Sequence, residues 1–94
     1  MKRTKADELA GMFNIKRSRS IEAVLKAEII NAVLKVVEKE GLTHVQLAKR
    51  SGLARSTVTG ILSGSLHKVT LDRVLKLLEG ADLTAELRVK KAAA

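Results

Sequence analysis

Apolar residues recur every three or four positions along most of this 94-residue chain, a spacing typical of amphipathic helices. The longest run predicts a helix from Ile21 to about Glu40, with Ser20 as its N-cap and Glu22 in the first turn, where the helix dipole favours a carboxylate. The apolar arc is wider than one partner helix requires, so residues 9–13 or a second subunit should cover the excess. Its apolar positions are Ala23, Val24, Leu25, Ala27, Ile29, Ile30, Val33, Leu34, Val36 and Val37.

Two short helices separated by a glycine are predicted next. Thr43 and Gln46 have the spacing of a capping box, which indicates the start of the first helix, and Gly52 is placed to end it in a left-handed conformation. The second helix should begin at about 54–55 and end at 63–64. Its core-facing positions at helical spacing are Val58, Ile61 and Leu62.

A last helix is predicted from Leu71 to Glu79, with Thr70 as its N-cap, Asp72 in its first turn and Gly80 as its stop. We expect its core face to consist of Leu71, Val74, Leu75 and Leu78.

After Gly80 the period of the pattern changes, because apolar residues at 83, 85, 87 and 89 alternate with polar ones. Strict alternation predicts a strand, although the residue types also permit a short final helix. A lone strand leaves its backbone groups unpaired. We therefore expect residues 83–90 to pair antiparallel with the same strand of a second copy, about a twofold axis.

The first 19 residues are basic and have two interpretations. They could form an arm that follows phosphates or enters a minor groove, or a frayed and solvated terminus. Within them, Leu9, Met12 and Phe13 share one side of a short helical segment and should pack on the main body. The basic residues are Lys2, Arg3, Lys5, Lys16, Arg17 and Arg19.

The composition favours a nucleic-acid partner. Eighteen Lys and Arg against ten Asp and Glu give a net charge of +8, which suits a polyanion, although it also serves plain solubility. A single aromatic residue argues for duplex DNA over RNA or single strands, which are usually bound by base stacking. With no cysteine and two histidines we expect no metal site and no cofactor. No apolar run approaches the ~20 residues of a membrane span, and the start lacks the apolar region of a signal peptide, so we expect a cytoplasmic, nucleoid-associated protein.

The polar face of the second short helix carries most of the candidate binding residues. Arg55 at its start can pair with guanine through two hydrogen bonds, and the small residues opposite Val58 would let the helix lie close to a surface. Free N–H groups at the start of the first short helix could hold a phosphate. No Asp or Glu occurs from 41 to 71, although a small polar face is also typical of solvated surface. The candidate DNA-binding residues are Thr43, His44, Arg55, Ser56, Thr57, Thr59, Gly60, Ser63 and Lys68.

The stretch LTHVQLAKRSGLARSTVTGILSG resembles the helix-turn-helix of the Cro and lambda-repressor-like (XRE-type) family. The resemblance implies that Ala48 is the small residue of the first helix, Gly52 the turn glycine, and Val58 and Ile61 the core face of the recognition helix. It also implies that the candidates on the second helix lie where the family contacts bases. Thr43 and His44 lie where the family contacts the DNA backbone. This chain departs from the family at Ala54, where a polar N-cap is common, and at His44, where Gln is common and where a histidine would make phosphate contact pH-sensitive.

The order of elements over about residues 18–90 is similar to that of HigA-like antitoxins in the same family. Such proteins bind their own promoter and neutralise a RelE-like (HigB-like) toxin that cleaves mRNA. Such toxins are usually basic, as this chain is, so electrostatic complementarity would not drive that pairing.

The patterns predict an all-α bundle with a short C-terminal β-strand that pairs across a homodimer, and the resemblance implies that the bundle is a lambda-repressor-like helix-turn-helix domain. We expect a basic segment at 1–19, a DNA-binding domain at 20–80, and a strand and tail at 81–94. The expected function is a transcriptional repressor that binds double-stranded DNA sequence-specifically, and the resemblance to HigA-like proteins implies that it is the antitoxin of a type II toxin–antitoxin pair. The alternative is a stand-alone regulator of the XRE type. We expect no enzyme, because no nucleophile–base pair and no phosphate loop is found.

Overall fold

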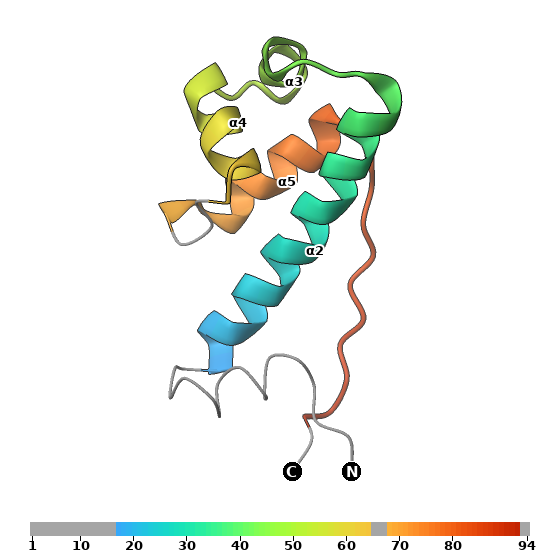
Figure 1. Ribbon diagram of the computed structural model, residues 1–94. Helices are drawn as coiled ribbons and strands as arrows, with labels where there is room; N and C mark the ends of the chain where they lie inside the picture. Colours follow the sequence, from blue (N-terminus) through green and yellow to red (C-terminus); the bar gives the residue numbers. More distant parts are fainter. Residues whose placement is uncertain (1–16, 65–67, 93–94) are drawn as a thin grey trace.

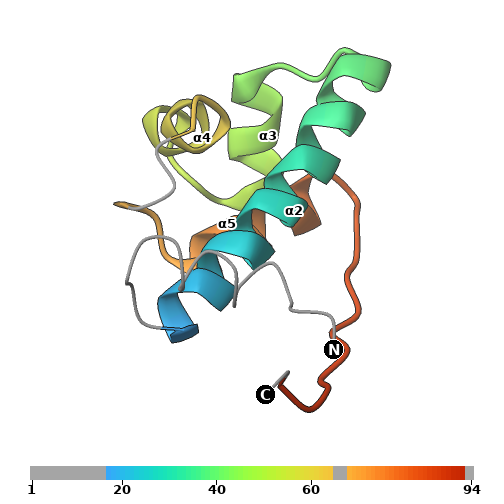
Figure 2. The same cartoon turned by 60° about the horizontal axis from the view of Figure 1, so that its bottom comes forward.

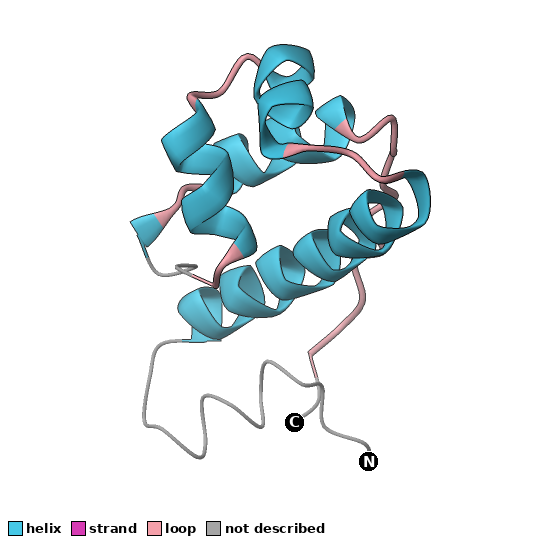
Figure 3. Cartoon of the chain, turned by 45° about the horizontal axis from the view of Figure 1, so that its top comes forward, coloured by secondary structure: helices cyan, strands magenta, loops and turns pink. Residues whose placement is uncertain are grey.

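The computed structural model describes residues 17–64 and 68–92, and this part of the chain forms four helices. They are α2 (Arg17–Glu40), α3 (His44–Ser51), α4 (Arg55–Leu62) and α5 (Leu71–Gly80). The long helix α2 and helix α5 form the base of the bundle, and α3 and α4 pack at its upper end (Figure 1). No strand is present in the described ranges (Figure 3). The helical part of the predicted fold is confirmed, and the short helix expected at 9–13 lies outside the described residues.

Helix α2 ends at Glu40 as predicted but begins earlier than predicted. It starts at Arg17, so Ser20 lies inside the helix and is fully buried, and the assignment of Ser20 as the N-cap is wrong. Serine is favoured at caps because its hydroxyl competes for nearby backbone groups. Its small size also suits a buried position inside a helix, which is where Ser20 lies.

Lys26 is buried in α2, although the helical pattern counts it as polar. Only 5% of Lys26 is exposed, and its Nζ donates to the backbone oxygen of Val69. The same Nζ lies 2.6 Å from Oε1 of Glu22, one turn earlier. The hydrogen bond from Lys26, followed by its positive charge, lowers the pKa of Glu22 below its ordinary value. Lys26 thus ties α2 to the segment that leads into α5.

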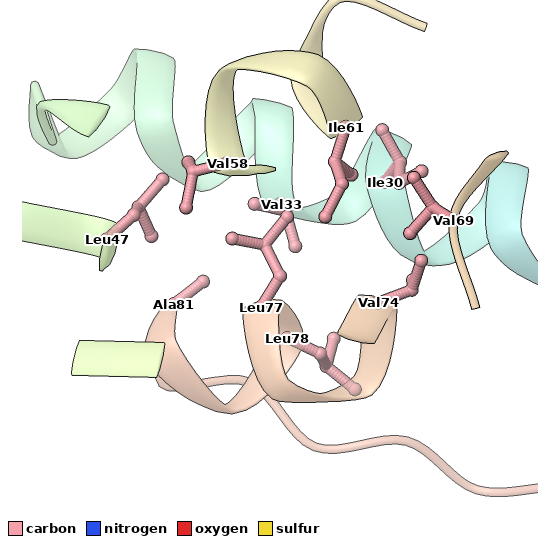
Figure 4. Packing of buried hydrophobic residues seen from close by; sticks show 10 residues of the cluster. All are labelled: Ile30, Val33, Leu47, Val58, Ile61, Val69, Val74, Leu77, Leu78 and Ala81. Atoms are coloured by element: carbon pink, nitrogen blue, oxygen red, sulfur yellow. The ribbon is translucent and has the colours of Figure 1, made fainter. Parts of the chain in front are cut away.

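The core is built from all four helices (Figure 4). Val33 of α2, Val58 of α4 and Leu77 of α5 have no exposed surface and meet near its centre. The expected face of α5 is partly wrong, because Leu75 is 44% exposed whereas Leu77 is buried. The residues of the core are Ile30, Val33, Leu47, Val58, Ile61, Val69, Val74, Leu77, Leu78 and Ala81.

Helix α5 is capped as predicted but ends differently. The Thr70 hydroxyl accepts a hydrogen bond from the backbone N–H of Arg73, at 3.3 Å. Gly80 is the last residue of the helix and not a stop beyond it. The residue that takes the left-handed conformation is Asp82, with φ 60°. Gly80 has a different role, since a Cβ added there would lie 2.9 Å from the Cβ of Ser51 at the end of α3. The absence of a side chain lets α3 and α5 approach.

Residues 83–92 leave the bundle as an extended segment on the side of α2 away from α4 (Figures 1 and 2). Leu83 packs against the core, and its N–H donates to the oxygen of Leu78 at 3.1 Å. Leu87 and Val89 are 71% and 87% exposed. The alternative of a final helix is wrong, and a strand is not formed within the described part of one chain. Pairing with a second copy stays a prediction.

Candidate nucleic-acid interface

A capping box begins α3, as the spacing of Thr43 and Gln46 predicts. The Thr43 Oγ1 accepts from the backbone N–H of Gln46 at 3.1 Å, and the N–H of Thr43 donates to Oε1 of Gln46 at 2.8 Å. The first four N–H groups of a helix have no intrahelical acceptor, and the box satisfies two of them, those of Thr43 and Gln46. The N–H groups of His44 and Val45 lie in the same first turn. Such N–H groups at the N-terminus of a helix can hold an anion.

The turn between α3 and α4 depends on Gly52. Its φ of 75° is left-handed, and its N–H donates to the oxygen of Ala48 at 3.0 Å. Ala54 precedes α4 with extended backbone angles and makes no side-chain cap. This agrees with the departure from the family pattern at that position. Leu47 and Val58, both fully buried, attach the two helices to the core.

The exposed face of α4 lies opposite its buried residues, Val58 and Ile61. At 100° per residue, Arg55, Thr59 and Ser63 fall on one stripe of this face. Four of the predicted site residues on α4 and at its C-cap are exposed, and Thr57 and Gly60 are half-buried at the flanks. The exposed four are Arg55, Ser56, Thr59 and Ser63.

Two polar groups, one on α4 and one at its C-cap, make hydrogen bonds within the chain. Ser63 Oγ donates to the backbone oxygen of Gly60 at 3.1 Å, so its proton is committed. Nδ1 of His44, at the start of α3, lies 2.8 Å from Oγ1 of Thr59. This hydrogen bond joins the start of one helix to the middle of the other. The two residues are 15 positions apart, and no local sequence signal indicates that they meet.

The surface around α3 and α4 is positive. The chain has no carboxylate from 41 to 71, and its cations there are exposed: Lys49 and Arg50 at the end of α3, Arg55 at the start of α4, and Lys68 after it. The next carboxylate, Asp72, lies 3.4 Å from Nζ of Lys76 on α5. A polyanion approaching α4 therefore meets only positive or neutral side chains from this stretch.

Two further searches cover only the described residues. No group of three or more His, Cys, Asp or Glu side chains in 17–64 and 68–92 is arranged to hold a metal ion. Among the helices of these same ranges, none has the length and apolar character needed to cross a membrane.

Comparison with known protein families gives a match. A family model described as a helix-turn-helix domain matches residues 12–90. No curated protein and no solved structure matches the chain. The match covers all four described helices and most of the extended segment.

Proposed function

Since this chain belongs to the helix-turn-helix domain family, we propose that it is a transcriptional regulator that binds double-stranded DNA with α4 in the major groove. The observation that supports this function is the exposed polar face of α4, which begins with Arg55 and lies in a stretch without carboxylates. The first residues of a recognition helix are those that meet base edges. Arg55 therefore takes the position with direct access to a base.

The other candidate residues divide into two groups by position. On α4, Ser56 and Thr59 share the exposed face with Arg55 and have hydroxyls that suit base edges or phosphates. At the start of α3, the free N–H groups beside Thr43 and His44 favour a phosphate, and exposed Lys68 favours a second one. Contacts of the second group fix the orientation of the protein on the duplex and carry no sequence information.

Replacing Arg55 with alanine should weaken binding to the preferred sequence by about 1–3 kcal/mol and relax the preference at one base pair. The reason is that arginine makes its bidentate contact with guanine. Its loss therefore weakens binding only to duplexes that have guanine at that position. The measurement is a titration of the full chain against a preferred duplex and against the same duplex changed at single positions.

Lys35→Ala is the matched control for charge. Lys35 is exposed on α2, two residues from fully buried Val33 and so on the far side of the helix. This variant also removes one positive charge and should leave the base preference unchanged. If Arg55→Ala loses affinity equally on all duplexes, Arg55 contacts a phosphate and the assigned base contact is wrong.

We further propose that the regulator is a homodimer held by residues 83–90. Leu87 and Val89 are exposed at alternate positions of an extended segment, which is the pattern of one apolar strand face without a partner. Antiparallel pairing with a second copy would cover them, satisfy the backbone groups, and set two recognition helices to read half-sites about 34 Å apart.

Changing Leu87 and Val89 together to aspartate should convert a dimer into a monomer of 10.2 kDa, measured by light scattering. Charges placed on a paired apolar face are strongly unfavourable. Leu83, which packs on the core, is left in place so that the bundle keeps its fold. Aspartates at Thr84 and Arg88, on the alternate face, should leave the dimer intact. A persistent dimer in the first variant would move the interface to α2 or to the residues that precede it.

A finer proposal is that the regulator is the antitoxin of a type II pair, which represses its own operon and neutralises a RelE-like toxin. The support is the order of elements described above, with the alternative of a stand-alone XRE-type regulator. Co-purification with a small basic RNase-like protein encoded beside it would distinguish the two. We propose no enzymatic activity for either.

A further inference from the structure

His44 and Thr59 make the one side-chain hydrogen bond that joins α3 to α4 among the described residues. His44 is half-buried and Thr59 is exposed on the same stripe as Arg55. An exposed hydrogen bond adds little to stability, because water competes for both partners. The hydrogen bond has a larger effect on the conformation of the Thr59 side chain. Threonine is β-branched, so holding Oγ1 toward His44 also fixes where its methyl group points.

We propose that His44 is a positioning residue that sets what Thr59 reads in the major groove. The inference rests on the proposed function and goes beyond it, since it assigns the specificity of one base position to a pair of residues. His44 acts through its two ring nitrogens. Nδ1 lies 2.8 Å from Oγ1 of Thr59, which leaves Nε2 for the phosphate contact proposed above at the start of α3.

The tautomer of His44 links these two contacts. A phosphate oxygen accepts hydrogen bonds only, so its contact with Nε2 requires the proton on Nε2. In a neutral ring, which is the form at a pH well above neutrality, Nδ1 then has no proton and must accept. Thr59 therefore donates its single hydroxyl proton to His44. Its oxygen keeps lone pairs toward the groove, where it can only accept.

An acceptor in the major groove selects base amines. Cytosine N4 and adenine N6 are the donors displayed there, whereas guanine and the thymine O4 present acceptors. Thr59 held by His44 should therefore prefer adenine or cytosine at its position. A free threonine hydroxyl rotates and can pair with donors and acceptors alike, so the preference depends on His44.

The test is selection of duplexes from a random DNA library by the full chain at about pH 8.5, where a histidine ring is neutral, followed by titration of single-base changes. Wild type should favour an amine-bearing base at one position by about fivefold or more, the lower end of what one base contact provides. His44→Ala and Thr59→Val should each remove that preference, and the double variant should lose no more than either alone. Preferences at all other positions should stay as in wild type.

His44→Asn separates positioning from phosphate contact. The asparagine Oδ1 occupies the place of Nδ1 and can accept from Thr59, but the side chain has no group where Nε2 reaches the phosphate. It should restore the base preference seen in wild type and bind all duplexes more weakly. A general loss of folding would not be rescued in this way. Ser56→Ala, on the same face without a bond to His44, should leave the preference at the Thr59 position unchanged.

The outcomes distinguish this inference from the function on which it rests. If wild type enriches no sequence, sequence-specific DNA binding itself is wrong. If wild type enriches a sequence and His44→Ala keeps the same preference at every position with uniformly weaker binding, His44 is a phosphate contact alone and the positioning role is overturned. The same holds if Thr59→Val and His44→Ala change different positions.

Discussion

Replacing Lys26 with alanine is expected to lower the free energy of unfolding by about 2–4 kcal/mol. Two losses add up. The buried oxygen of Val69 loses its donor, and the buried stem of Lys26 leaves a space in the bundle. Its ion-pair partner Glu22 has half of its side chain in solvent, so the carboxylate of Glu22 is not left as a buried charge. The expected cost therefore stays below that of breaking a fully buried ion pair. Chemical denaturation at neutral pH, followed by circular dichroism, measures it.

Lys26→Met is the control for this change. Methionine keeps the apolar stem and needs no hydration, so it should recover at least half of the loss. Equal losses in both variants would show that the stem contributes nothing. No loss in Lys26→Ala would show that Lys26 is solvated in the folded protein.

The pH dependence of stability gives an independent check on the same contact. The pKa of Glu22 is lowered in the folded chain by its hydrogen bond from Lys26 and by that positive charge. A lowered carboxyl pKa contributes stability above the ordinary pKa of glutamate, and the contribution is lost as the pH falls through the folded value. This acid-side loss should be smaller in Lys26→Met than in wild type.

Replacing Gly80 with alanine is expected to destabilise the fold by about 1–3 kcal/mol. In a helix, Gly→Ala normally stabilises by up to about 1 kcal/mol. At Gly80 the new Cβ would lie 2.9 Å from the Cβ of Ser51 and 3.0 Å from its backbone nitrogen. A backbone atom cannot move aside as a flexible side chain can, so α3 and α5 must separate. The steric term therefore exceeds the gain in helix propensity.

Gly60→Ala is the matched control, measured without DNA. Gly60 lies within α4, its φ is not positive, and a Cβ there would have no neighbour within 4 Å. It should raise stability by a few tenths to about 1 kcal/mol. If Gly80→Ala behaves like Gly60→Ala, α3 and α5 do not approach as closely as described.

The helix-turn-helix could be predicted from the sequence because its signals are local. The capping box at Thr43 and the left-handed Gly52 each depend on residues within one turn, and both are found where expected. The start of α2 could not be predicted in this way. Ser20 satisfies the local rule for an N-cap, but the helix continues past it toward Arg17 and Ser20 is fully buried, which the residues next to it do not indicate.

Two further features depend on contacts that periodicity does not contain. Helix α5 has apolar residues on most of its sides, so their spacing alone does not show which face packs on the core. These residues include Leu71, Leu75, Leu77 and Leu78. Packing against α2 and α3 selects the face with Leu77. The burial of Lys26 and the contact of His44 with Thr59 join residues 43 and 15 positions apart. Both pairs of partners come together only when the helices pack.

The most direct test of the proposed function is a gel shift with the full chain. It compares the DNA just upstream of its own gene with a scrambled duplex of the same composition, at about 50 and about 200 mM salt, a range over which phosphate-only binding weakens steeply. A sequence-specific regulator that represses its own promoter should retain the upstream DNA at the higher salt and release the scrambled duplex. Equal loss of both duplexes at the higher salt would contradict this function and leave only a basic protein that associates with DNA through its charge.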